Sequence, residues 1–134
     1  MNTMEELTAP SHPKASATRS ILRELNTSSG EIEASAAITS DGYIIGAVLG
    51  EGVDEDRFAA MCASLLALAE RAAEEISRGD LKQVMIEGTT GLMLLVHAGK
   101  EAVLAVAAKP TLNLGMVFLE ARKSAAKLET LLES

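Results

Sequence analysis

Short turns separate the apolar segments of this chain, and they restrict its fold more than any other feature. Residues 31–40 alternate apolar and polar side chains, and residues 43–49 are rich in Ile and Val, with Asp41-Gly42 between them. Asp-Gly between two such segments predicts a β-hairpin, because glycine adopts positive φ without steric cost. Three further strand-like segments follow later, at residues 82–88, 92–97 and 101–107. Turns this short exclude parallel crossovers, so the strands within each group are antiparallel.

Helical periodicity occupies most of the remaining chain. A short amphipathic helix is expected over 16–26, a long helix from its cap at Asp54 to about Ser77, and a last helix after Asn113. The predicted order is α-β-β-α-β-β-β-α, and five strands with helices on both faces form an α/β sandwich. We expect residues 1–15 to be a flexible tail and residues 16–134 to form one domain.

Charge and composition exclude several classes of function. Twelve Lys and Arg against nineteen Asp and Glu give a net charge of −7, and aromatic residues make up only 2% of the chain. Such a surface repels a phosphate backbone and offers little for bases to stack on, so nucleic-acid binding is not expected. The longest nearly apolar stretch, 58–69, is about 12 residues and too short to insert across a membrane. With one cysteine and an acidic start, the chain is expected to be cytoplasmic.

No group of residues predicts an active site. His12 and His97 are isolated, and Cys62 lies among apolar residues as a packing side chain would. The glycines at 46–52 precede a helix but lack the Lys-Ser/Thr ending of a phosphate loop. The acids at 54–56 fit ordinary helix capping. We therefore expect no catalytic residue, no metal and no cofactor, and we expect that the protein is not an enzyme.

The long middle helix carries the most information about partners. Its apolar positions at helical spacing should cover the sheet, namely Phe58, Cys62, Leu65, Ala69, Ala72 and Ile76. A further set extends round one flank toward the back of the helix, namely Ala59, Ala63, Leu66 and Ala67, and the small residues among them would let a second helix approach closely. A second copy of the same helix across a two-fold axis is the simplest partner. The alternative is an alanine-rich helix whose back is simply solvated.

A third line along this helix is polar. Arg57, Ser64, Arg71 and Glu75 should face solvent or another protein, and Leu68 lies at their margin as an apolar anchor. These five residues are the predicted docking surface.

Several motifs together resemble the roadblock family, which includes dynein roadblock light chains and bacterial regulators of Ras-like GTPases. The motifs are Gly30-Glu31-Ile32, Ser40-Asp41-Gly42, Gln83-Val84-Met85-Ile86-Glu87, Asn113-Leu114-Gly115-Met116-Val117 and Glu120-Ala121-Arg122. They occur in order over about residues 16–132, and the stand-alone bacterial proteins encoded near small GTPases are the most similar subgroup.

The resemblance implies a sheet of order 2-1-5-4-3, with the long helix on one face and the two terminal helices on the other. It implies a homodimer in which two third strands pair through Val84, Met85 and Ile86 and two long helices meet. It also implies a docking platform for a Ras-like small GTPase that modulates GTP hydrolysis. A pure scaffold in a larger signalling or motor-type complex is the alternative, and a small-molecule sensor is a further one.

Overall fold

A computed structural model describes residues 12–134, and residues 1–11 of the expected tail lie outside the described residues. The elements are α2 (Ala15–Thr27), β1 (Ile32–Thr39), β2 (Ile44–Val48), α3 (Glu55–Glu75), β3 (Gln83–Gly88), β4 (Gly91–His97), β5 (Ala102–Ala108) and α4 (Leu114–Leu132). The predicted order of helices and strands is confirmed. No helix within residues 12–134 combines the length and the apolar character needed to cross a bilayer.

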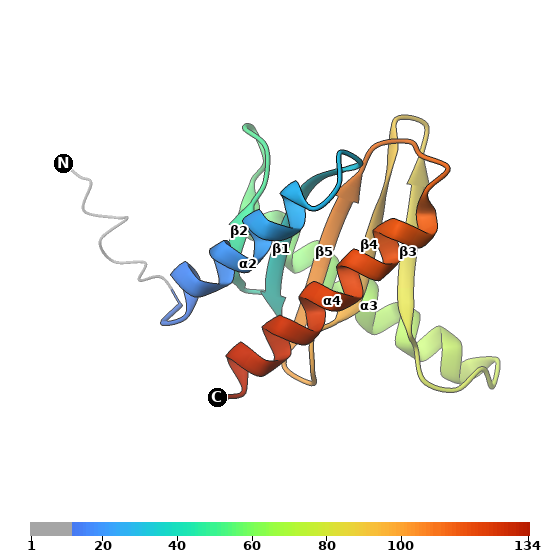
Figure 1. Cartoon of the computed structure of the whole chain (residues 1–134). Coiled ribbons are helices and arrows are strands. Elements are labelled where there is room, and N and C mark those ends of the chain that lie inside the picture. Colours follow the sequence, from blue (N-terminus) through green and yellow to red (C-terminus); the bar gives the residue numbers. More distant parts are fainter. Residues whose placement is uncertain (1–11) are drawn as a thin grey trace.

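The five strands form one antiparallel sheet in the order β2-β1-β5-β4-β3, as predicted. Helices α2 and α4 lie on one face of the sheet, and α3 crosses the other face alone (Figure 1). The central strand β5 is almost wholly buried because helices cover it from both sides. Strands β2 and β3 are the two edges of the sheet.

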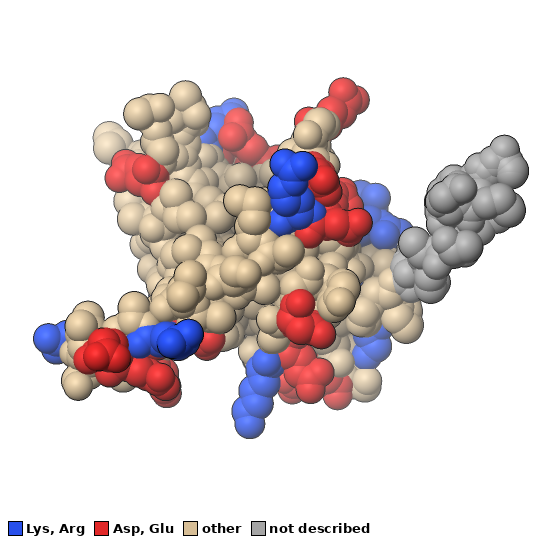
Figure 2. Space-filling view, turned by 180° about the vertical axis from the view of Figure 1, so that it is seen from behind, with Lys and Arg blue, Asp and Glu red and all other residues tan. Residues whose placement is uncertain are grey.

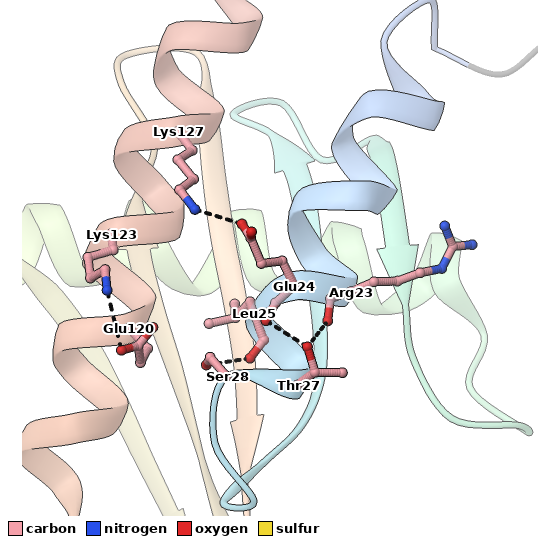
Figure 3. Close-up of polar contacts among 8 residues, drawn as sticks. All are labelled: Arg23, Glu24, Leu25, Thr27, Ser28, Glu120, Lys123 and Lys127. Atoms are coloured by element: carbon pink, nitrogen blue, oxygen red, sulfur yellow. Dashed lines mark hydrogen bonds and ion pairs between the residues drawn. The ribbon is translucent and has the colours of Figure 1, made fainter.

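The face under α2 and α4 holds the larger of two cores. Leu22 and Leu25 of α2 are fully buried there over β1 and β2, and Val117 and Leu128 of α4 are fully buried over β4 and β5. At the surface the two helices are linked by an ion pair, in which Lys127 Nζ lies 2.6 Å from Glu24 Oε1 (Figure 3). This hydrogen bond and the lysine charge lower the pKa of Glu24.

Lys14 ties the start of α2 to the end of α4. Its ammonium donates to the carbonyl oxygens of Leu131, at 2.6 Å, and Ser134, at 2.9 Å, and to Ser134 Oγ at 3.0 Å. A cation at the C-terminal end of a helix satisfies free carbonyls and interacts favourably with the helix dipole. The last two residues of the expected tail are thus part of the folded chain, because Lys14 contacts the end of α4 and Ala15 is buried at the start of α2.

The predicted hairpin between β1 and β2 is present. Gly42 has a φ of 98° and donates its N–H to the carbonyl oxygen of Thr39 at 2.9 Å, so the turn requires a residue that tolerates positive φ. A Cβ added at Gly42 would lie 3.5 Å from Ala60 Cα and 3.6 Å from Ala63 Cβ. The turn therefore rests directly on the small residues of α3.

The ends of α3 and α4 differ in detail from the expectations. Asp54 caps α3 as predicted, because its Oδ1 accepts from the backbone N–H of Arg57 at 3.1 Å. The helix ends at Glu75, earlier than the expected Ser77, which itself has a left-handed φ of 58°. Asn113 occupies the N-cap position of α4 but its side chain makes no capping bond. Its backbone N–H instead donates to Thr111 Oγ1 at 2.8 Å.

The sheet-facing side of α3 is also rotated relative to the expectation. The buried residues of the helix are Ala59, Cys62 and Leu66, all in its first half. Ala72 and Ile76 were expected on the sheet but are exposed. The reason is visible in Figure 1, where the last turns of α3 project past the edge strand β3 and have no sheet beneath them.

Candidate functional site

The outer edge of β3 is open in the single chain, because β3 pairs with β4 alone. Val84 points toward α3, where it packs against the core cluster on that face. Met85 points to the opposite face and is half-exposed, as is Ile86 on the α3 side. An open edge of this length with apolar side chains is a template for pairing with another strand.

An apolar flank of α3 continues this edge. Met61, Leu68 and Ile76 are each 61% exposed, and they follow one another at helical spacing. Leu65 lies between Leu68 and Ile76 in rotation and is partly buried against the core on the α3 face of the sheet. Figure 2 shows a broad uncharged area on this side of the molecule, with charges gathered at its margins.

The small-residue flank predicted as the helix part of a dimer interface lies elsewhere. Ala59 and Leu66 are buried in the core of the single chain, so their assignment to a partner surface is wrong. Ala63 is partly buried beside the Gly42 turn. Ala67 is exposed and lines a polar groove with Glu70. This flank accommodates the turn between β1 and β2, and the opposite flank is the one left apolar and open.

The predicted docking line is exposed along its whole length. Arg57, Ser64, Arg71 and Glu75 recur at intervals of seven and four residues and share one side of α3 that faces away from the sheet. Arg57 Nε lies 3.8 Å from Asp54 Oδ2 within the same turn, an exposed contact of small energetic value. Leu68 lies where this line meets the apolar flank, so it borders both surfaces.

The single cysteine is a packing residue on the α3 side. Cys62 is 2% exposed, and burial raises its pKa to about 11. The thiol is therefore protonated near neutral pH and is a weak nucleophile. Within residues 12–134, no three His, Cys, Asp or Glu side chains come together as a metal site. His97 forms an exposed pair with Glu70, with 3.2 Å between Nε2 and Oε2.

The glycines at 46–52 have separate structural roles. A Cβ at Gly46 would lie 3.0 Å from Thr18 Cγ2, so the glycine lets α2 approach β2 closely. A Cβ at Gly50 or Gly52 would meet no other part of the chain within 4 Å, so both glycines lie in the open connection that leads to α3. The four acids from Glu51 to Asp56 surround this connection with negative charge, which disfavours phosphate.

Two surface features were missed by the sequence reasoning. A groove of about 440 Å³ lies on the α4 face beside the open edge, lined by Met85, Leu112 and Leu114 among others. Leu112 is fully exposed there. A leucine in the polar turn before α4 is the sequence feature from which this groove could have been predicted. Arg122 of α4 reaches the edge strand, where its Nη2 donates to Gln83 Oε1 at 2.5 Å.

A family model and several relatives match this chain. The family model described as Roadblock/LC7 domain matches residues 18–108. Protein MJ1340 of Methanocaldococcus jannaschii, described as uncharacterized, is 37% identical over 111 residues, which cover 83% of this chain and 96% of the relative. MJ0310 of the same organism is also 37% identical over 111 residues, with the same coverage of both chains.

Solved structures share the fold at lower identity. A structure described as MglB with tetrameric arrangement has a TM-score of 0.81 at 19% identity and covers 92% of this chain and 93% of its own. A Roadblock/LC7 domain from Streptomyces avermitilis has a TM-score of 0.79 at 20% identity and covers 85% of this chain and 96% of its own. Because the family model spans most of the chain, this chain belongs to the Roadblock/LC7 family.

Proposed function

We propose that this protein is a non-enzymatic homodimeric platform that docks a Ras-like small GTPase and modulates its GTP hydrolysis. The observation that carries the proposal is the continuous apolar surface from the open edge of β3 to the exposed flank of α3. Membership of the Roadblock/LC7 family supports it, since the resemblance to bacterial regulators of Ras-like GTPases implies this role.

Dimerisation accounts for the unpaired features of the single chain. Pairing two β3 strands would satisfy the free backbone groups of the edge and continue the sheet into a second copy. The same step would bring the apolar flanks of two α3 helices together and remove Met61 from water, with Leu68 at the margin of the contact. Isologous contacts of this kind close on themselves and give a dimer.

The docking line on α3 supports a GTPase site on the dimer. Two copies of α3 side by side would repeat Arg57, Ser64, Leu68, Arg71 and Glu75 across the two-fold axis. The resulting surface mixes charges of both signs with an apolar margin, as transient interfaces commonly do. A monomeric GTPase placed over the axis would cover both copies, so we expect one GTPase per dimer.

The test uses the full chain and the Ras-like GTPase encoded nearest to it, loaded with a non-hydrolysable GTP analogue. Light scattering should give about twice the chain mass of 14.0 kDa for the free protein, and calorimetry should give one GTPase per dimer. Arg71→Glu should weaken the complex at least tenfold without changing the dimer. Arg23→Glu, an exposed charge reversal on α2, is the matched control and should bind as the native chain does.

Two results would overturn parts of the proposal. Tight binding of GTP by the isolated protein would contradict a non-enzymatic platform. Retained binding to another protein, with no GTPase bound in either nucleotide state, would favour the scaffold function instead.

A further inference from the structure

The open edge strand β3 presents different chemistry on its two faces. Gln83, Met85 and Glu87 point to the α4 face, where Gln83 is bonded to Arg122 and Met85 and Glu87 line the groove. Val84 and Ile86 alternate with them and point to the α3 face. The polar groups thus lie at the two ends of the strand on one face, and an apolar residue lies between them.

Symmetry limits how two copies of β3 can pair. A two-fold axis perpendicular to the sheet maps each face onto itself, so one residue must lie opposite its own copy. The strand offers three central residues for this position, namely Val84, Met85 and Ile86. Because side chains alternate, each choice sets a different list of cross-strand neighbours.

Two of the three choices set polar groups against apolar ones. An axis at Val84 places Gln83 opposite Met85 of the second copy. An axis at Ile86 places the carboxylate of Glu87 opposite Met85 of the second copy. An axis at Met85 instead sets the two Met85 side chains together, Gln83 opposite Glu87, and Val84 opposite Ile86. Only this register matches polar with polar and apolar with apolar on both faces of the sheet.

We propose that β3 pairs in this register, with Met85 at the two-fold axis and Glu87 of each copy facing Gln83 and Arg122 of the other. The inference rests on the proposed homodimer and specifies its interface. Arg122 makes the choice stronger, because its guanidinium already lies at Gln83 and supplies a cation for the incoming carboxylate. Within one chain Glu87 and Arg122 lie near opposite ends of β3, and no ion pair between them is present among the described residues. The contact is therefore specific to the dimer.

Charge exchange tests the register directly. Glu87→Arg gives a homodimer with two Arg-Arg contacts, and Arg122→Glu gives one with two Glu-Glu contacts. Each variant alone should dimerise at least tenfold more weakly than the native chain, since like charges across an interface are costly. An equimolar mixture should recover dimers, because every contact in the heterodimer joins an arginine to a glutamate. Analytical ultracentrifugation of the separate and mixed variants measures both effects.

Lys123→Glu is the matched control for charge. Lys123 neighbours Arg122 in the sequence but pairs with Glu120 on α4, with 3.6 Å between Nζ and Oε2. The Lys123→Glu substitution should therefore leave dimerisation unchanged. Native-like dimers from both single variants, or no recovery on mixing, would overturn the register while leaving the dimer intact. A native chain that stays monomeric up to about 100 μM would overturn the dimer as well, so the two failures are distinguishable.

Cysteine cross-linking gives an independent readout of the same register. Directly opposite residues have Cα atoms close enough for a disulfide, whereas residues offset by two positions do not. Met85→Cys should therefore cross-link to itself under mild oxidation. Val84→Cys and Ile86→Cys should each fail alone and cross-link when mixed. The native chain is the control, because its only thiol, Cys62, is buried. Self-cross-linking of Val84→Cys or Ile86→Cys in place of Met85→Cys would assign the axis elsewhere.

Discussion

The two faces of the sheet are covered to very different extents. Helices α2 and α4 together cover one face and bury long aliphatic side chains from both helices. The other face has α3 alone, whose buried residues are confined to its first half, and it leaves Met61, Leu68 and Ile76 exposed. The first face is the more completely covered of the two within one chain, although Met116 and Leu119 of α4 are exposed as well. We therefore expect the α2 and α4 face to contribute most of the stability of the single chain, and the proposed partner contacts to lie on the α3 face.

The largest expected effect is a truncation on the face covered by α2 and α4. Leu128→Ala removes a fully buried side chain of α4 and leaves a cavity in the larger core. We expect a loss of about 2–5 kcal/mol in the free energy of unfolding. Urea unfolding should show this loss at every protein concentration. A loss below about 1 kcal/mol would show that this face contributes less than its burial indicates.

The next effect concerns the buried thiol under α3 and depends on pH. The pKa of Cys62 is about 11 in the folded chain against an ordinary 9.0, so the unfolded chain releases the proton first. The free energy of unfolding therefore keeps its full value below pH 9 and falls as the pH rises from 9 toward 11. The expected loss is about 2–3 kcal/mol. Urea unfolding of the native chain and Cys62→Ala between pH 8 and 11 measures it. An equally steep alkaline decline in both proteins would contradict the assignment.

A smaller effect is expected where α2 is tied to α4. Lys14→Met removes the three hydrogen bonds that Lys14 Nζ makes at the end of α4, and a loss of about 1–2 kcal/mol is expected. Lys123→Met is the control, because Lys123 makes only an exposed contact with Glu120. Its loss should stay below about 0.5 kcal/mol. Equal melting temperatures for the two variants would show that the Lys14 hydrogen bonds do not stabilise the fold.

The smallest effect on the monomer is expected on the α3 face. Leu68→Ala makes the same chemical change as Leu128→Ala but at an exposed position. The unfolding free energy of the monomer should change by less than about 0.5 kcal/mol. Dimerisation should weaken, because apolar surface at the proposed contact is lost. A large concentration-independent loss of stability would show that Leu68 packs within its own chain.

The fold was predictable wherever local chemistry determines the structure. The Asp41-Gly42 turn, the short connections between the later strands and the Asp54 cap each depend on neighbouring residues, and the structure confirms all of them. The order of strands in the sheet came from the family resemblance. It depends on contacts between distant segments, which spacing along the chain does not determine.

The side of α3 that faces the sheet could not be predicted from the sequence. The helix is apolar nearly all round in its first half, so a helical wheel gives no single sheet-facing side. The Gly42 turn determines which side of α3 faces the sheet. This turn fits against Ala60 and Ala63, and Ala59 and Leu66 then lie in the core. The partner residue Arg122 was missed for a similar reason. Its contact with Gln83 joins residues 39 positions apart.

The contact between Lys14 and Ser134 has a consequence for engineering the chain. With Lys14 Nζ only 2.9 Å from the Ser134 carbonyl oxygen, the backbone at these two residues lies within one lysine side chain's reach. Figure 1 shows the first turn of α2 and the last turn of α4 at the same end of the molecule. A short linker can therefore join residues 14 and 134, and the chain can be reopened at the exposed Thr89-Thr90 turn. Such a circular permutant would begin and end beside β3, so a reporter fused there would respond to whatever pairs with that strand.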